Sequence, residues 1–425
     1  MLWWSCLAFD GRDAGQRPDL SGPEEVVVSA DGAFAVHFTR EGGDAPSGGD
    51  AADGIPVAVH GVLDGLTLGT DRFAAEGWRP LVGDLGVGGS DAIDVYVMDL
   101  DANGYANSVP GPDGDSCYMR VDGGLAGLGR ILESVALHEL HHCVEYRYGR
   151  THAWVHEASA THAQYAHVLD PALELALGVL YGERLSHPER AMDDLEGRFE
   201  YAGFLVAKYW AERTREGDPL PDLWEALATH GTDWEAAFTV EAERRWGEAL
   251  SETWLELATW NLFACDADDG QHYDSEVLPC VADVGVPVET WDGAPIRLSH
   301  SAAPYTAAYL SLPADGEGLE VLCDGDGRVR LVEVRADGLR GRWASDEAGT
   351  ATLEGAEGEV VLVAVGDGPP LDLICEARRY ALPTARGDAS CGCRAAPGAS
   401  GLVLLLLLPC VRRRRLRASA ASSMR

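Results

Sequence analysis

The chain contains very little positive charge. Its 33 basic residues stand against 69 acidic ones, which gives a formal net charge of −36, and Lys208 is the single lysine. Because such an acidic surface repels nucleic acid and anionic lipid, we expect neither as a partner of the folded body. Hydrophobic residues nevertheless make up 46% of the 425 residues, which excludes a disordered chain and is enough for two or three domains.

The folded body also lacks a C-x-x-C pair, although the chain has ten cysteines. Cys6 lies near the start and three cysteines lie in the tail, which leaves six for the body. An even number of this kind is typical of disulfides formed in an oxidising compartment, and buried free thiols are the alternative. Pairing in chain order would give Cys117–Cys143, Cys265–Cys280 and Cys323–Cys375.

A complete signal peptide is missing from the first residues. Met1 to Ala8 is apolar, but the segment has no basic residue and is too short for a full leader. We therefore interpret residues 1–20 as the remnant of a leader and expect the folded body to begin at residue 21.

Periodicity in the first part of the body predicts strands and then helices. Alternating and β-branched segments predict strands within 24–38 and 92–100, and a short apolar segment follows at 117–121. Apolar residues spaced three and four apart predict helices at 55–79 and 128–148. The same spacing predicts further helices at 152–168, 171–181, 201–213, 221–230 and 234–263.

The character of the sequence changes after residue 284. Short β-type runs separated by Gly and Asp predict a small all-β sandwich there. We therefore expect an α+β protein with a mixed sheet and a helical part in one domain. The expected divisions are a domain at 21–283, a sandwich at 284–383 and a separate tail at 384–425.

One motif carries chemistry, the H-E-L-H-H sequence of residues 138–142. Residues four apart on a helix lie on the same face, so His138 and His142 can reach one zinc ion. Glu139, beside them, is then placed to activate the zinc-bound water. A helix with incidental surface histidines is the alternative interpretation.

A catalytic zinc site needs a third protein ligand and one open position. Glu157 follows His142 by fifteen residues, on the next expected helix, and completes a His₂Glu set. The histidines at 152, 156 and 162 are rival ligands, of which His156 is the strongest. Glu145 is either a partner that orients His142 or a solvated salt-bridge residue.

H-E-L-H-H followed by W-x-x-E-x-x-A resembles the gluzincin metallopeptidases, and the wider stretch resembles the metallopeptidases common in myxobacteria. The matching segments are residues 94–96 (DVY), 138–142, 154–160 and 201–205 (YAGFL). The resemblance implies a zincin-like domain with zinc ligands His138, His142 and Glu157 and with Glu139 as general base. It also implies a downstream residue that stabilises the oxyanion, for which Tyr201 is the candidate. The additional histidine at 141 departs from the family pattern and offers a second ligand register.

Oxygen-bearing side chains also alternate at Asp99, Asp101 and Asn103, with Gly104 next. This spacing matches the first half of a calcium-binding loop, but the twelfth position holds Pro110 in place of glutamate. A plain turn after a strand is the preferred interpretation, and a calcium site is the alternative.

The tail combines Cys391 and Cys393 with an apolar run at 401–411 and a cluster of arginines at 412–415. This order resembles the myxobacterial C-terminal sorting signal. It implies a sorting protease that acts near Cys391 or Cys393, and a body exported to the cell surface. Arginines stay on the cytoplasmic side of a membrane, which agrees with export of the body.

Together these observations predict a surface-anchored or secreted metalloendopeptidase that hydrolyses peptide bonds in proteins or peptides. Zinc would polarise the peptide carbonyl, and Glu139 would carry a proton from water to the leaving amine. A non-catalytic adhesin that keeps the same fold is the alternative.

Overall fold

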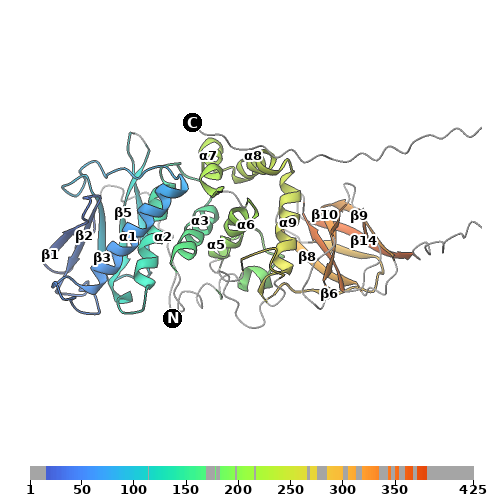
Figure 1. Cartoon of the computed structure of the whole chain (residues 1–425), viewed down its shortest axis with the longest axis horizontal. Helices are drawn as coiled ribbons and strands as arrows, with labels where there is room; N and C mark the ends of the chain where they lie inside the picture. Colours follow the sequence, from blue (N-terminus) through green and yellow to red (C-terminus); the bar gives the residue numbers. More distant parts are fainter. Residues whose placement is uncertain are drawn as a thin grey trace, which may run out of the picture. The chain divides into compact units, whose positions relative to one another are not determined.

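The structure is a computed structural model (Figure 1). The structure describes residues 16–112, 114–168, 178, 182–196, 199–214, 217–265, 269–274, 285–299, 305–312, 318–334, 343–345, 350–353, 359–366 and 371–380. These residues belong to one compact unit, Met1–Leu382. Most of the helix predicted at 171–181, Cys280, Cys391, Cys393 and the apolar run at 401–411 lie outside the described residues.

The fold is mixed α+β, as predicted, and begins with a five-stranded sheet of order β1-β2-β3-β5-β4. β2, β3 and β5 run parallel, whereas β1 and β4 are antiparallel edge strands. The predicted mixed sheet is therefore present. The strands are β1 (Glu24–Val28), β2 (Phe34–Thr39), β3 (Ile93–Met98), β4 (Gly104–Val109) and β5 (Ser116–Asp122).

Two helices pack together beside this sheet (Figure 1): α1 (Val57–Glu76) and α2 (Ile131–Glu145). Three glycines spaced four apart on α1, at 61, 65 and 69, form the contact with α2. A Cβ at Gly65 would lie 2.2 Å from the carbonyl oxygen of Glu133, so only glycine permits this separation. The three glycines of α1 therefore determine how closely α1 and α2 approach each other.

The sheet sends alternate side chains to opposite faces. Residues such as Val95 join the main hydrophobic core, whereas Asp94 and its neighbour Tyr96 point to the other face. That second face receives Arg17, which bonds the carboxylates of Asp94 and Asp84 and lies over the ring of Tyr118. Arg17, which was assigned to the predicted leader segment 1–20, therefore contacts the folded body.

The central part is helical, with two interruptions that were not predicted. The segment expected at 234–263 divides at Gly247, whose φ of 68° ends α8 in the left-handed conformation. The segment at 201–213 divides at Gly203, where a Cβ would lie 3.0 Å from Ala158. Lys208 lies in α6 and is only 2% exposed. The helices are α3 (Ala153–His167), α5 (Phe199–Ala202), α6 (Phe204–Thr214), α7 (Leu220–His230), α8 (Trp234–Trp246) and α9 (Leu250–Leu262).

The C-terminal strands form two sheets with a shared hydrophobic core, as expected for a sandwich. The first has the order β11-β10-β13-β8-β6, and the second β12-β9-β14-β7. The predicted Cys323–Cys375 disulfide joins β9 to β14. The strands are β6 (Glu289–Thr290), β7 (Ile296–Ser299), β8 (Ala307–Leu312), β9 (Gly318–Asp326), β10 (Arg328–Val334), β11 (Trp343–Ser345), β12 (Thr350–Leu353), β13 (Glu359–Val365) and β14 (Asp372–Tyr380).

The sandwich also packs against the helical part. Side chains of α9 share a hydrophobic cluster with β8, β10 and β13, and the Tyr309 hydroxyl donates to the carbonyl of Ala258 at 3.0 Å. The boundary predicted at 283/284 is therefore bridged by common packing. Cys265 is disulfide-bonded, although its predicted partner is outside the described range. Within that range, no helix is long and apolar enough to cross a membrane.

Candidate metal centre

The H-E-L-H-H motif lies in the middle of α2, where every residue from Ser134 to Glu145 is buried. After α2 the chain turns at Gly149, whose φ is 102°, and α3 returns antiparallel along α2. Successive contacts establish this direction: Gln164 meets Ser134, and Ser159 meets His141. The antiparallel return brings Glu157 of α3 to the histidine face of α2.

The structure brings His138, His142 and Glu157 together. Oε2 of Glu157 lies 3.4 Å from Nε2 of His138 and 3.7 Å from Nε2 of His142. One ligand atom from each of the three residues falls within 4.8 Å of the others, and all three side chains are buried. Two imidazole nitrogens and one carboxylate oxygen thus converge on a single point.

These converging atoms have no hydrogen-bond partner among the described residues. Nε2 of His138, Nε2 of His142 and Oε2 of Glu157 are each buried and unsatisfied. Buried polar atoms are almost always hydrogen-bonded, because an unsatisfied one costs about 1–3 kcal/mol. Two imidazole nitrogens and a carboxylate oxygen that converge in this way fit a shared cation, and this donor set matches zinc.

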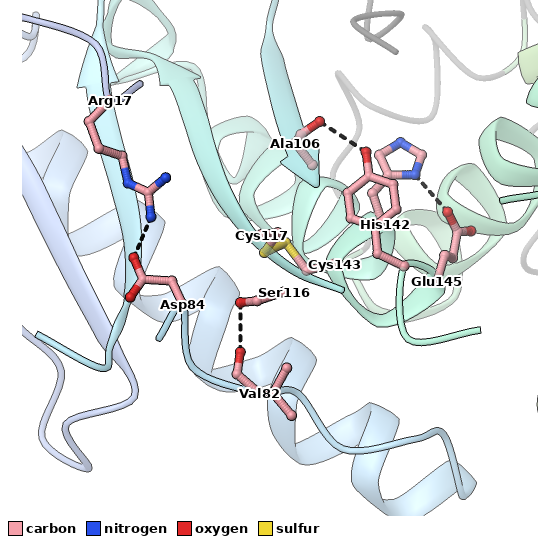
Figure 2. Close-up of a disulfide and its surroundings, with 10 residues drawn as sticks. Arg17, Val82, Asp84, Ala106, Ser116, Cys117, His142, Cys143 and Glu145 are labelled. Carbon is pink, nitrogen blue, oxygen red and sulfur yellow. Dashed lines mark hydrogen bonds and ion pairs between the residues drawn. A yellow bond between two sulfur atoms is a disulfide. The ribbon is translucent and has the colours of Figure 1, made fainter. Parts of the chain in front are cut away.

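Glu145 and His156 lie behind this cluster. Nδ1 of His142 donates to Oε2 of Glu145 at 2.7 Å, as Figure 2 shows, and Nδ1 of His156 donates to the same oxygen at 2.8 Å. The other ring nitrogen of His156 accepts from the backbone N–H of Thr151 at 3.3 Å. Both nitrogens of His156 are therefore engaged away from Glu157, and Glu145 is a buried partner of His142 rather than a solvated residue.

The other histidines lie outside the candidate cluster, although Nε2 of His141 is 3.4 Å from Oε1 of Glu145. His141 bonds Ser159 at 2.8 Å and packs edge-on against Trp78, and burial lowers the pKa of His141 to about 4. His152 is half-buried at the start of α3, and His162 lies on the same helix. None of these three joins a candidate metal cluster within the part of the chain that the structure describes.

The electrostatics keep the cluster charged. Burial opposes ionisation of Glu157, but His142 and His138 outweigh that effect and lower the pKa of Glu157 to about 2. Burial likewise opposes protonation of His142, but Glu145 and Glu157 outweigh it and raise the pKa of His142 well above its usual value. A proton on His142 is therefore the species that an incoming metal ion must displace.

Glu139 faces the edge strand β4. The side chain is fully buried, and a Cβ at Gly104 would lie 2.7 Å from its Oε1. The first residue of β4 therefore has to be small for the strand to approach this carboxylate. Tyr146, which follows α2, donates its hydroxyl to the carbonyl of Ala106 on β4 at 3.0 Å. Both contacts were missed from the sequence, where Gly104 was interpreted as part of a turn.

Tyr201 lies beside the cluster, as a residue with a role at this site must. The ring is buried in α5 and stacks on His138, with the centroids 6.4 Å apart and the planes inclined by 30°. The structure thus brings the predicted oxyanion residue next to one predicted ligand.

The predicted calcium loop does not form a cluster. Asp101 is exposed and accepts from the Tyr105 hydroxyl at 3.0 Å, whereas Asn103 is buried. With Asp99 these residues make no candidate metal group among the described residues. The bend at 101–103 agrees with the preferred interpretation of a plain turn, but Gly104 begins strand β4, so the turn is shorter than predicted.

The predicted Cys117–Cys143 disulfide is present, and Figure 2 shows it near His142 of the candidate cluster. Cys143 follows His142 on α2, and Cys117 lies in β5, so the bond fixes the helix to the sheet.

Comparison of the chain with family models, with curated proteins and with solved structures finds no match. The geometry of the site therefore carries the functional argument.

Proposed function

We propose that this chain is a zinc metallopeptidase of the gluzincin type that hydrolyses peptide bonds in proteins or peptides. The observation that carries the proposal is the set of three buried, unsatisfied ligand atoms of His138, His142 and Glu157, within 4.8 Å of one another. A His₂Glu set with a glutamate next to the first histidine is the arrangement of catalytic zinc sites in peptidases. In this proposal the mixed sheet, α2 and α3 form a zincin-like domain.

A zinc ion held by these residues acts as a Lewis acid toward a carbonyl oxygen and makes water more acidic. The residues of the chain do the rest. The Glu139 carboxylate accepts a proton from the attacking water and delivers it to the leaving amine. Tyr201, stacked on His138, is the candidate for stabilising negative charge on the attacked carbonyl oxygen.

We also propose that the body is exported and held at the cell surface through the C-terminal tail. A sorting protease acting near Cys391 or Cys393 would process the chain there, and two disulfides among the described residues agree with an oxidising compartment. Cell fractionation of a Cys391→Ala/Cys393→Ala variant tests this part. Unchanged surface attachment in the variant would contradict it.

Zinc content and peptidase activity of the full chain test the catalytic proposal. We expect about one zinc ion per chain in the parent, and a large loss in Glu157→Ala. Glu133→Ala is the matched control, because Glu133 lies on α2 and pairs with Arg130 away from the cluster. Glu139→Gln should keep the zinc and lose activity, and full activity in that variant refutes the mechanism. Absence of zinc from the parent refutes the metal site and favours the adhesin.

A further inference from the structure

A buried carboxylate joins two imidazoles behind the metal cluster. Oε2 of Glu145 accepts from Nδ1 of His142 at 2.7 Å and from Nδ1 of His156 at 2.8 Å. The side chains of Glu145 and His156 are completely buried, and that of His142 is 6% exposed. Because these side chains are buried, bulk solvent is largely kept from the two bonds, and each bond restrains the ring that makes it.

The backbone N–H of Thr151 determines which nitrogen of His156 carries the proton. The N–H of Thr151 can only donate, so Nε2 of His156, at 3.3 Å, must accept and carries no proton. Nδ1 of His156 therefore carries its proton and donates to Glu145. The same carboxylate oxygen accepts from Nδ1 of His142, so Nε2 is the ring nitrogen of His142 that faces Glu157 and could bind a metal ion.

From this geometry we propose that Glu145 and His156 are positioning residues that orient His142 for the metal and couple it to the start of α3. The inference rests on the proposed metal site and adds a specific role for two residues outside it. Glu145 has a flexible side chain on the same helix as His142. The bond from His156 fixes that side chain from a second helix, so the two donors together hold the carboxylate in one orientation.

The placement of His156 beside Glu157 gives this arrangement a further property. His156 restrains the orientation of His142 through Glu145, and the next residue of α3, Glu157, is the third ligand. A displacement of α3 would therefore weaken both the restraint on His142 and the binding by Glu157. The turn at 149–152 contributes as well, because the N–H of Thr151 is in it. The metal centre is thereby sensitive to the connection between α2 and α3, although no residue of that turn belongs to the metal cluster.

The test is the apparent zinc dissociation constant of the full chain, measured by competition with a chromophoric chelator. We expect Glu145→Ala and His156→Ala each to bind zinc about tenfold or more weakly. Glu145→Gln, which has the same size, should lie between the parent and Glu145→Ala because it keeps one acceptor oxygen. The matched controls are Glu133→Gln on α2 and His167→Asn on α3, which pairs with Glu76. Both controls should bind zinc as the parent does.

Cobalt substitution adds a readout that a loss of general stability would not produce. The visible spectrum of bound Co²⁺ reports ligand geometry, and we expect it to change in the Glu145 and His156 variants and to be unchanged in both controls. The double variant Glu145→Gln/His156→Asn should be no weaker than the worse of its single variants, because the two residues act as one unit.

The outcomes separate this inference from the proposed function. A parent that binds zinc tightly, with variants at 145 and 156 that bind it equally well, overturns the positioning role and leaves the metal site standing. Additive losses in the double variant also overturn it, because independent contributions contradict a shared unit. A parent without zinc overturns both proposals. Weaker zinc binding and an altered cobalt spectrum in folded Glu145→Gln and His156→Asn, with unchanged controls, supports the inference.

Discussion

The Cys117–Cys143 disulfide can be compared with a second one, Cys323–Cys375, which joins two strands of the sandwich and does not involve α2 or α3. The first bond closes a separation of 26 residues and the second, Cys323–Cys375, one of 52. In the loop-entropy description, removing them costs about 3.5 and about 4 kcal/mol respectively. Cys117→Ala/Cys143→Ala and Cys323→Ala/Cys375→Ala should therefore lose similar amounts of stability.

Their effects on the metal centre should differ. Cys143 follows His142 in α2, and the bond fixes that helix to β5, so only the first double variant should loosen the ligand geometry. We expect its zinc affinity to fall by about tenfold, whereas the second variant should bind zinc as the parent does. Urea unfolding and chelator competition on the same preparations measure both quantities. Equal zinc affinities in the two variants, or no loss of stability in either, would refute the reasoning.

Three more predictions follow from contacts in the N-terminal part. Gly104→Ala should retain zinc but lose at least tenfold in peptidase activity, because the methyl group would meet Oε1 of Glu139; an unchanged rate would show that the strand can move. The apparent zinc affinity should rise about tenfold per pH unit through neutrality and fall as pH falls, because zinc must displace the proton that the raised pKa of His142 retains; a flat pH profile contradicts this. Gly65→Ala should lower the urea midpoint by forcing α1 away from the carbonyl of Glu133, whereas an increase would mean that helix propensity dominates.

The helices that carry the candidate site could be predicted closely from the sequence. The i, i+4 spacing of His138 and His142 determines that they share a helix face, whatever surrounds the helix. Glu157 was a stronger ligand candidate than His156 on chemistry alone. The structure adds a geometric reason to prefer Glu157 over His156. The N–H of Thr151 and the carboxylate of Glu145 bind the two ring nitrogens of His156.

Other features depend on approach distances that no local pattern encodes. Gly203 interrupts a helical segment because α5 approaches Ala158 of α3, and nothing in the neighbouring residues signals that contact. Gly247 differs, since a glycine after Arg244 and Arg245 is the usual end of a helix and could have been recognised. The contacts of Arg17 could not be predicted for the same reason. Its hydrogen-bond partners Asp84 and Asp94 are 67 and 77 residues away along the chain.

Because Lys208 is buried, cleavage of the chain at this residue can be used to measure local unfolding. As the single lysine, it is the only position at which a lysine-specific endoproteinase can cut. At 2% exposure inside α6, the adjoining peptide bond becomes accessible only when the helix opens. The rate of that single cut, with and without zinc, would measure how far a metal bound between α2 and α3 stabilises a helix that packs against α3.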